Sequence, residues 1–305
     1  MVVIKGGGSQ HPYFFRKNMM IVIFCANRTS FDLKGNIMTT PKVVLVTGVS
    51  SGIGRTAAMQ FARHGCQVFG TVRNLATAVP LPGVTLVAMD VRDTDSVQRA
   101  VADIIGRAGR IDVLVNNAGV NMTGAVEETS IAEAHVMFET NVFGAMRTIH
   151  AVLPQMRALG AGRIVNISSV LGFLPSPYMG LYSASKHALE GLSESLDHEV
   201  RQFGIRVTLV EPAYAKTSLE ANSPTANSTI AAYDRERTAS AAAVAREINK
   251  APAPDSVAAT IVEAALGKWQ MRKTPPGSAS LLSKLRRFMP AGPVDASLRK
   301  QFGLG

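Results

Sequence analysis

Short apolar runs alternate with longer amphipathic segments along the chain after residue 41. The runs are rich in valine, isoleucine and leucine, which is typical of strands buried on both faces of a sheet. They are KVVLVT (42–47), CQVFGTV (66–72), VTLVAM (84–89), IDVLVN (111–116), GRIVNIS (162–168) and IRVTLVE (205–211). The segments between them have helical spacing and fall at 53–64, 94–107, 133–158 and 182–203. This alternation predicts an α/β fold, doubly wound, with a central parallel sheet flanked by helices.

The first 38 residues lack this periodicity. Their apolar run MMIVIFCA is too short to span a bilayer, and no small-residue cleavage pattern follows it. Because Met38 opens a natural-looking start, MTTPKVVLVTG, we expect residues 1–38 to be a disordered or mis-annotated extension. Residues 39–305 are then one domain, in which 213–254 forms a loop or lid and 278–305 forms a C-terminal helical tail.

Composition and charge narrow the class of protein. The chain has 305 residues, of which 47% are hydrophobic and 18% charged, as in an ordinary globular protein. Of the net charge of +10, residues 1–38 carry +4 and residues 268–305 carry +7, so the middle of the chain is left at −1. A nearly neutral body argues against a nucleic-acid partner. Two cysteines favour a reducing, cytoplasmic compartment, and the scattered histidines predict no metal site.

A glycine-rich turn, TGVSSGIGR, follows the first apolar run directly. Gly48, Gly52 and Gly54 let the backbone bend sharply and approach a ligand, and the N–H groups of the following helix favour a pyrophosphate. The spacing differs from G-x-G-x-x-G, and a plain tight turn is the alternative. The position after the first strand favours a dinucleotide site.

The end of the second apolar run bears on the choice of cofactor. An NAD site places an Asp or Glu roughly 20 residues after the glycine turn. Here the stretch FGTVRN has no acid, and Arg73 offers a guanidinium suited to a 2′-phosphate, although an ordinary surface arginine is the alternative. We therefore expect NADP(H) to be preferred, with NAD(H) as the second choice.

Several motifs, taken together and in order, resemble those of the short-chain dehydrogenase/reductase (SDR) family from about Pro41 onward. They are TGVSSGIG (47–54), DV (90–91), NNAG (116–119), Asn141, SS (168–169) and YSASK (182–186). YSASKHALEG and the tail look most similar to the branch of 17β-hydroxysteroid and retinol dehydrogenases. The resemblance implies a Rossmann fold, an NAD(P)-dependent oxidoreductase, and a homodimer or homotetramer. One departure is Ala213, which stands where the family usually has glycine.

The resemblance also implies the residues that hold the cofactor, with Pro212 and Thr217 on its nicotinamide side. The full set is Gly48, Ser50, Ser51, Gly52, Ile53, Gly54, Arg73, Asp90, Val91, Asn117, Ala118, Gly119, Tyr182, Lys186, Pro212 and Thr217.

YSASK places a phenol and an ammonium one helical turn apart, so that Tyr182 and Lys186 share one face of a helix. A free phenol has a pKa of about 10, and a nearby cation lowers it. Such a pair arises easily by chance, but Ser169 reinforces it from the end of a strand, where parallel sheets bind ligands. Its neighbour Ser168 is the structural alternative. Asn141 is unfavourable inside a helix unless its amide has a specific partner.

The resemblance assigns these four residues to reversible hydride transfer between nicotinamide and a carbonyl carbon. Tyr182 supplies or removes the proton of the substrate oxygen, and Ser169 hydrogen-bonds that oxygen. Lys186 tunes the tyrosine and binds the nicotinamide ribose. Asn141 holds a water that relays protons to Lys186.

The run VLGFLPSPYMGL (170–181) lies beside the catalytic tyrosine and predicts an apolar pocket wall with Phe173, Tyr178 and Met179. Core filling is the alternative. Together with the lid, this wall favours a bulky apolar alcohol or carbonyl substrate, such as a steroid, a retinoid or a lipid. The competing hypotheses are the same chemistry on a small polar, sugar or acyl-thioester ketone, and a non-catalytic NADPH-binding sensor.

The tail segment GSASLLSKLRRFMP predicts an amphipathic helix. Its apolar positions, Leu281, Leu282, Leu285, Phe288 and Met289, alternate with basic residues. Such a helix either packs over the substrate cleft or makes peripheral contact with an anionic membrane.

Overall fold

The computed structural model describes residues 29–31, 37–215, 225–277, 280, 283 and 290–303. The chain divides into two compact units, Met1–Pro41 and Lys42–Gly305. In the first unit, β1 (Thr29–Phe31) and β2 (Ile37–Thr39) pair antiparallel with Ser30 opposite Met38. Two short strands therefore occur among the described residues of the expected extension.

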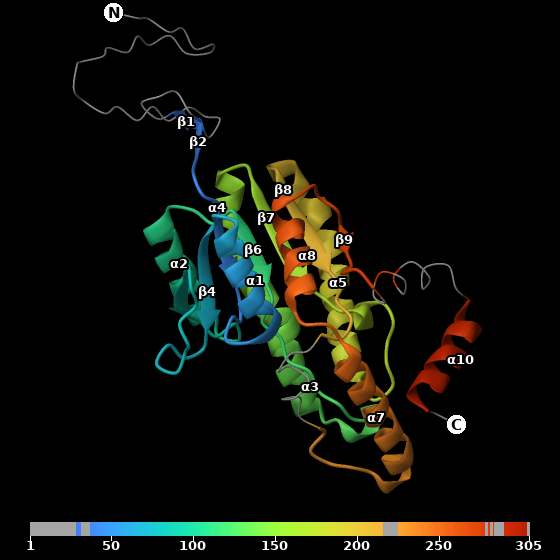
Figure 1. Cartoon of the computed structure of the whole chain (residues 1–305). Helices are drawn as coiled ribbons and strands as arrows, with labels where there is room; N and C mark the ends of the chain where they lie inside the picture. Colours follow the sequence, from blue (N-terminus) through green and yellow to red (C-terminus); the bar gives the residue numbers. More distant parts are fainter. Residues whose placement is uncertain are drawn as a thin grey trace, which may run out of the picture. The chain divides into compact units, whose positions relative to one another are not determined.

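In the second unit, the described residues form a seven-stranded sheet in which all paired strands are parallel. The strand order is β5-β4-β3-β6-β7-β8-β9, so the chain starts at the centre, winds to one edge and then returns to wind to the other (Figure 1). The strands are β3 (Val43–Val46), β4 (Gln67–Val72), β5 (Val84–Ala88), β6 (Val113–Asn116), β7 (Gly162–Ile167), β8 (Ile205–Val210) and β9 (Arg272–Lys273). The predicted doubly wound Rossmann fold is confirmed. The sequence did not predict β9, because two residues leave no periodicity.

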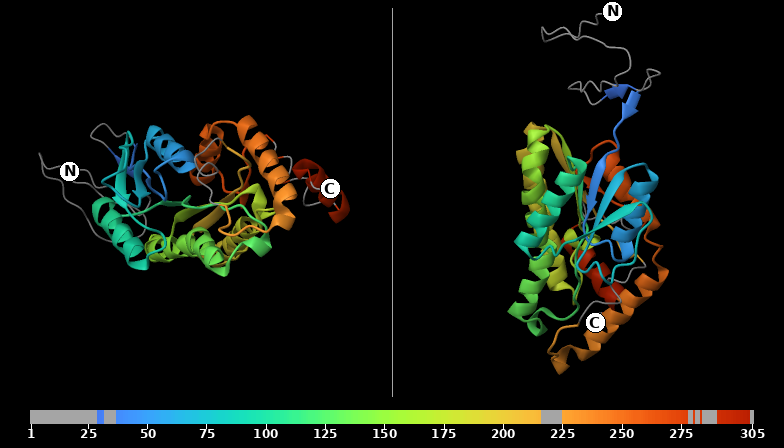
Figure 2. Two further views of the ribbon diagram at one scale, coloured as in Figure 1. Left: turned by 90° about the horizontal axis from the view of Figure 1, so that it is seen from below. Right: turned by 90° about the vertical axis from the view of Figure 1, so that its left-hand side faces the viewer.

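Helices cover both faces of the sheet (Figure 2). The α-helices of the described residues are α1 (Gly52–Arg63), α2 (Thr94–Ala108), α3 (Ile131–Phe138), α4 (Gly144–Ala158), α5 (Gly180–Val200), α7 (Asp234–Lys250), α8 (Asp255–Leu266) and α10 (Ala291–Phe302). Three predicted helices match to within a few residues. The fourth, expected at 133–158, is interrupted by the π-helical turn η2 (Glu139–Phe143), which separates α3 from α4.

The central strand β3 sends alternate side chains into two cores. Val46 packs in the cluster that contains Phe61 of α1, and Leu45 packs in the cluster that contains Ile104 of α2. All four side chains are fully buried. The unbroken apolar run of β3 is explained by this burial on both faces.

The parallel arrangement brings the carboxyl ends of β3, β4, β6, β7 and β8 to one edge of the sheet, where doubly wound folds bind ligands. Thr217 and the apolar positions of the predicted tail helix lie outside the described residues. No helix in the described part of the chain is long and apolar enough to cross a membrane.

Candidate active site

A cavity of about 650 Å³ lies at this edge of the sheet. Seventeen of the residues predicted for the site line it: Gly48, Ser50, Ser51, Gly52, Ile53, Gly54, Arg73, Asp90, Val91, Asn117, Ala118, Gly119, Ser169, Met179, Tyr182, Lys186 and Pro212. Of the other described candidates, Asn141, Phe173 and Tyr178 are not among the lining residues. The dinucleotide motifs and the Tyr-Lys pair therefore face one space.

The glycine turn is packed tightly against the end of β6. Gly48 has φ +70°, and a Cβ there would lie 3.0 Å from Ala118 Cα. A Cβ on Gly54 would overlap the side-chain amide of Asn117. That amide donates to the carbonyl oxygens of Thr47 at 2.9 Å and Gly48 at 3.0 Å. Side chains are excluded at these two positions, so the backbone of the turn stays open to the cavity there.

The N-terminus of α1 points into the same space through Gly52, Ile53 and Gly54. The first turn of α1, all of which is described, carries no acidic side chain. Free N–H groups and the positive end of a helix dipole bind anions. A bare-backbone cradle beside a helix N-terminus fits the pyrophosphate of a dinucleotide.

Two arginines line the cavity beyond the carboxyl ends of β4 and β5. Arg73 follows β4 and is exposed. Arg92 was not predicted, although it directly follows the DV motif. Its guanidinium donates to Asp90, with Nη2 at 2.6 Å from Oδ2. This hydrogen bond holds the pKa of Asp90 below its usual value, and the charge of Arg73 adds to the effect.

Asn141 lies in the π-helical turn η2, behind the cavity wall, and is 2% exposed. Its Oδ1 accepts from the Val120 N–H at 2.8 Å, and its Nδ2 donates to the Val120 carbonyl at 2.9 Å and to Ser185 Oγ at 3.0 Å. Asn141 therefore ties the NNAG loop to α5. π-Helical turns often mark functional sites.

Tyr182 and Lys186 occupy one face of α5, with Lys186 Nζ 5.6 Å from the centre of the Tyr182 ring. Nζ donates to the Ile167 carbonyl at 2.8 Å. Lys186 is 6% exposed. Burial lowers its pKa to about 8, and the carboxylate of Glu190 acts in the opposite direction. Lys186 is therefore an ammonium below about pH 8.

Both serines of the SS motif line the cavity, but their hydroxyls have different partners. Ser169 Oγ accepts from the Leu171 N–H at 3.1 Å, at the start of the turn η3 (Val170–Gly172). Ser168 Oγ donates to Glu190 Oε1 at 2.7 Å, so its proton is already used in a hydrogen bond to α5. The Ser169 hydroxyl keeps its proton for a substrate oxygen, which favours Ser169 over Ser168.

The wall around Tyr182 is apolar. Met122, Met137, Val170, Leu171 and Met179 form one buried cluster with the tyrosine, and all five line the cavity. Of these five, the sequence analysis named Met179, and Val170 and Leu171 belong to the predicted wall run 170–181. Met122 and Met137 were not predicted, because they come from segments far earlier in the chain.

Phe173 and Tyr178 lie outside this wall. Phe173 packs against the back of the cluster. Tyr178 has φ 60°, the only positive value for a non-glycine residue in the described part of the chain. Its hydroxyl donates to Glu236 at 3.4 Å, and its ring meets Tyr233 edge to face, with centroids 6.5 Å apart. Tyr178 thus contacts the segment that leads into α7.

Two buried carboxylates hold that same segment. Glu128 accepts from the Ile230 N–H at 2.8 Å and from the Ala125 N–H at 2.9 Å. Glu133 caps the start of α3 and accepts from the Asn227 N–H at 3.0 Å. Backbone hydrogen bonds hold the pKa of both glutamates below the usual value, chiefly from Ile230 for Glu128.

Comparison with known proteins agrees with this geometry. Residues 42–228 match the family model described as short chain dehydrogenase. A 3-ketodihydrosphingosine reductase of Bacteroides thetaiotaomicron is 42% identical over 60% of this chain and 67% of its own length. Retinol dehydrogenase 8 of Bos taurus is 41% identical over 59% of this chain and 61% of its own length. The chain thus spans about two thirds of these relatives.

Solved structures show the same fold. A short-chain dehydrogenase from Streptomyces avermitilis has a TM-score of 0.72 and 36% identity, covering 86% of this chain and 96% of its own. An SDR from Burkholderia phymatum in complex with NAD has a TM-score of 0.70 and 28% identity, covering 81% and 93%. ElxO with NADP bound has a TM-score of 0.64 and 26% identity, covering 77% and 97%.

The glycine turn yields a direct test of cofactor binding. Gly54→Ala places a methyl group against Asn117, so we expect NADPH affinity to fall about tenfold or more, as overpacking typically costs. The control is Gly106→Ala, where a Cβ meets nothing within 4 Å. Titration of NADPH fluorescence measures both variants, and unchanged affinity in Gly54→Ala would contradict the cradle.

Proposed function

The chain belongs to the short-chain dehydrogenase family, and we propose that it interconverts an alcohol and a ketone or aldehyde, with NADP(H) preferred over NAD(H). One observation carries the proposal. Tyr182, Lys186 and Ser169 line the same cavity as the glycine turn and the N-terminus of α1. A proton donor and a dinucleotide cradle therefore share one space.

Residues of this chain transfer the proton to and from the substrate oxygen. In reduction, the Tyr182 hydroxyl donates its proton to the substrate oxygen, and in oxidation the phenolate takes that proton back. The Lys186 ammonium, 5.6 Å from the ring centre, stabilises the phenolate by its charge. Ser169 donates a hydrogen bond to the substrate oxygen and orients it. General acid-base catalysis of this kind contributes about 10²- to 10⁴-fold in rate.

The cofactor, when bound, supplies or accepts the hydride. The Gly48–Gly54 turn and the first N–H groups of α1 would hold its pyrophosphate. Arg73, at the end of β4, would pair with a 2′-phosphate, since no acid stands there to bind a free ribose hydroxyl. Lys186 would also hold the nicotinamide ribose, and Asn141 would hold the water of the proton relay.

A bulky apolar substrate is supported by the methionine-rich wall around Tyr182. Methionines adapt to irregular apolar ligands. Two of the relatives are named for retinol and 3-ketodihydrosphingosine, both of which have long hydrocarbon portions. A small polar ketone would leave most of this wall in contact with water.

Residues 213–254 are the proposed substrate lid. Their described part is held to η1 (Val126–Glu128) and α3 by Glu128 and Glu133, and to the turn before α5 by Tyr178. Val244 of α7 packs against the apolar cluster around Tyr182. These contacts attach the described part of the lid on the substrate side of the cavity, whereas its last residues, Ile248, Asn249 and Pro254, line a second hollow beside the glycine turn.

The homodimer or homotetramer, the cytoplasmic location and the membrane contact of the tail stay predictions from the sequence. The lining of the cavity argues for none of them.

The reaction is tested by assaying the purified chain with NADPH against retinal, steroid ketones, long-chain 3-keto amines and small polar ketones. Tyr182→Phe keeps the ring and removes the proton donor. We expect it to lower kcat about 10²- to 10⁴-fold on the best ketone and to leave NADPH affinity near wild type. Tyr233→Phe, which loses a hydroxyl bonded to Glu127, is the control and should keep most activity. More than a tenth of wild-type kcat in Tyr182→Phe would refute the assignment.

Cofactor preference is tested at Arg73. Arg73→Ala should weaken NADPH binding about tenfold or more, because a charge-assisted hydrogen bond to the 2′-phosphate is lost. NADH lacks that phosphate, so its affinity should change less than about twofold. Arg99→Ala, on the exposed face of α2, controls for a general loss of positive charge. Equal weakening of both cofactors would reject the assignment.

The lid is tested at Glu128. Glu128→Gln keeps the shape but weakens the acceptor for Ile230, so KM for the ketone should rise about three- to tenfold while NADPH affinity stays unchanged. Glu247→Gln, in α7 and paired with Lys250 at the surface, is the matched control. If kcat and NADPH affinity fell in Glu128→Gln while KM stayed constant, residues 213–254 would not be the substrate lid.

A further inference from the structure

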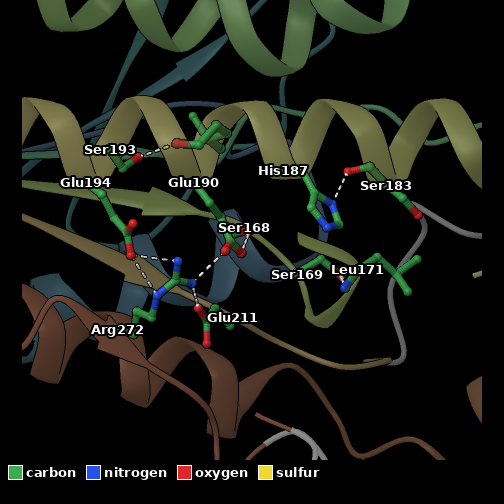
Figure 3. A network of polar contacts seen from close by, with 11 residues as sticks. Ser168, Ser169, Leu171, Ser183, His187, Glu190, Ser193, Glu194, Glu211 and Arg272 are labelled. Carbon is green, nitrogen blue, oxygen red and sulfur yellow. Dashed lines mark hydrogen bonds and ion pairs between the residues drawn. The ribbon is translucent and has the colours of Figure 1, made fainter. Parts of the chain in front are cut away.

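A buried charged cluster lies directly behind the active-site turn, where α5, β8 and β9 meet (Figure 3). We call Glu190, Glu211 and Arg272 the charge cluster. Arg272 Nη1 donates to Glu190 Oε2 at 2.5 Å and also to Glu211. Glu190 is 4% exposed and Glu211 is 1% exposed. Glu194 joins from the rim, where its Oε1 accepts from Arg272 Nη2 at 2.8 Å.

Lys186 is a buried cation near this cluster. It lies one helical turn before Glu190 on the same face of α5, and it is 6% exposed. The carboxylate of Glu190 acts on it through its charge, in the direction that favours the ammonium. A buried charge far from any opposite charge is strongly destabilising, so Glu190 stabilises the buried ammonium of Lys186.

Glu190 also touches the turn that presents Ser169. Its Oε1 accepts from Ser168 Oγ at 2.7 Å. A Cβ on Gly172 would overlap Glu190 Oε1 and would lie 2.5 Å from Ser168 Oγ. The turn η3 is therefore packed directly on the Ser168–Glu190 pair. Ser168 is in turn fixed to β8, since its N–H donates to the Val210 carbonyl at 2.8 Å.

We propose that Glu190 is a positioning residue for the reaction. It acts on Ser169 through Ser168, it acts on Lys186 through its charge, and Arg272 holds it in place. The inference rests on the proposed function. Glu211 and Glu194 also bind Arg272, so an ion pair that merely joins α5 to β9 would not require Glu190. Among these carboxylates, Glu190 is the one bonded to the serine motif.

The direction of the electrostatic effect follows from the neighbours of Glu190. Ser168 faces it from β7, Arg272 from β9, and Lys186 from its own helix, with Glu211 behind the guanidinium. Its carboxylate raises the pKa of Lys186 against the effect of burial. Removing that charge lowers the pKa of Lys186, so the ammonium is lost at a lower pH.

Glu190→Gln removes the charge while the amide oxygen still accepts from Ser168, and its NH2 group then faces Arg272 in place of a carboxylate oxygen. We titrate NADPH by fluorescence between pH 6 and pH 9.5. Affinity should fall on the alkaline side as Lys186 deprotonates, and in Glu190→Gln this midpoint should move to lower pH, with about three- to tenfold weaker binding at pH 8. Glu194→Gln removes the same charge at the rim and should keep the wild-type midpoint.

Ser168→Ala isolates the positioning. It keeps the charge of Glu190 and removes the hydrogen bond, so kcat should fall about three- to tenfold while the binding midpoint stays at the wild-type pH. Circular dichroism and thermal melting verify folding. If Glu190→Gln does not fold, Glu190→Asp replaces it. Aspartate keeps the charge, but its shorter side chain withdraws from Ser168. We therefore expect kcat to fall while the pH midpoint of NADPH binding stays constant.

An unmoved midpoint in Glu190→Gln, an equal shift in Glu194→Gln, or a moved midpoint in Glu190→Asp overturns the inference. Failure of the proposed function looks different. In that case the wild type binds NADPH but reduces no ketone of the panel, and the binding titrations still decide whether Glu190 acts on Lys186.

Discussion

The hydrogen bonds between the ends of β3 and β6 set the geometry of the whole ligand edge. Thr47 Oγ1 accepts from the N–H groups of Asn117 at 3.0 Å and Ala118 at 2.9 Å, and the Asn117 amide returns two bonds to the glycine turn. Adjacent parallel strands end at the same edge of the sheet. This short network therefore fixes the glycine turn at that edge, where the N-terminus of α1 faces the cavity. The cradle for an anion is thus a consequence of strand pairing.

A second constraint is the cost of burying charge beside a reactive phenol. An ammonium is useful next to Tyr182 only while it stays protonated, yet burial lowers the pKa of Lys186 to about 8. One turn further along α5, Glu190 supplies an opposite charge, and Arg272 holds that carboxylate in place. The same helix therefore carries the proposed catalytic pair, Tyr182 and Lys186, and part of its electrostatic support.

The two sides of the cavity differ in polarity. Its cofactor side offers backbone groups and arginines, whereas its substrate side offers methionines and branched aliphatic side chains. The proposed lid is attached on the substrate side by buried carboxylates that accept backbone N–H groups, and Glu128 also pairs with the guanidinium of Arg237. Such bonds are strong because the acceptor is charged.

Local pattern was enough to determine six of the seven strands of the described sheet, the helices α1, α2 and α5, the glycine turn and the shared face of Tyr182 and Lys186, because each depends on neighbours within a few residues. Other features depend on segments far apart in the chain, and only the tertiary structure decided them. Arg272 meets Glu190 across 82 residues, and Glu133 meets Asn227 across 94. The position of Tyr178 outside the cavity wall is of the same kind, since it follows from contacts with the segment before α7. No periodicity records such pairings, because they arise only when the sheet brings its strand ends together.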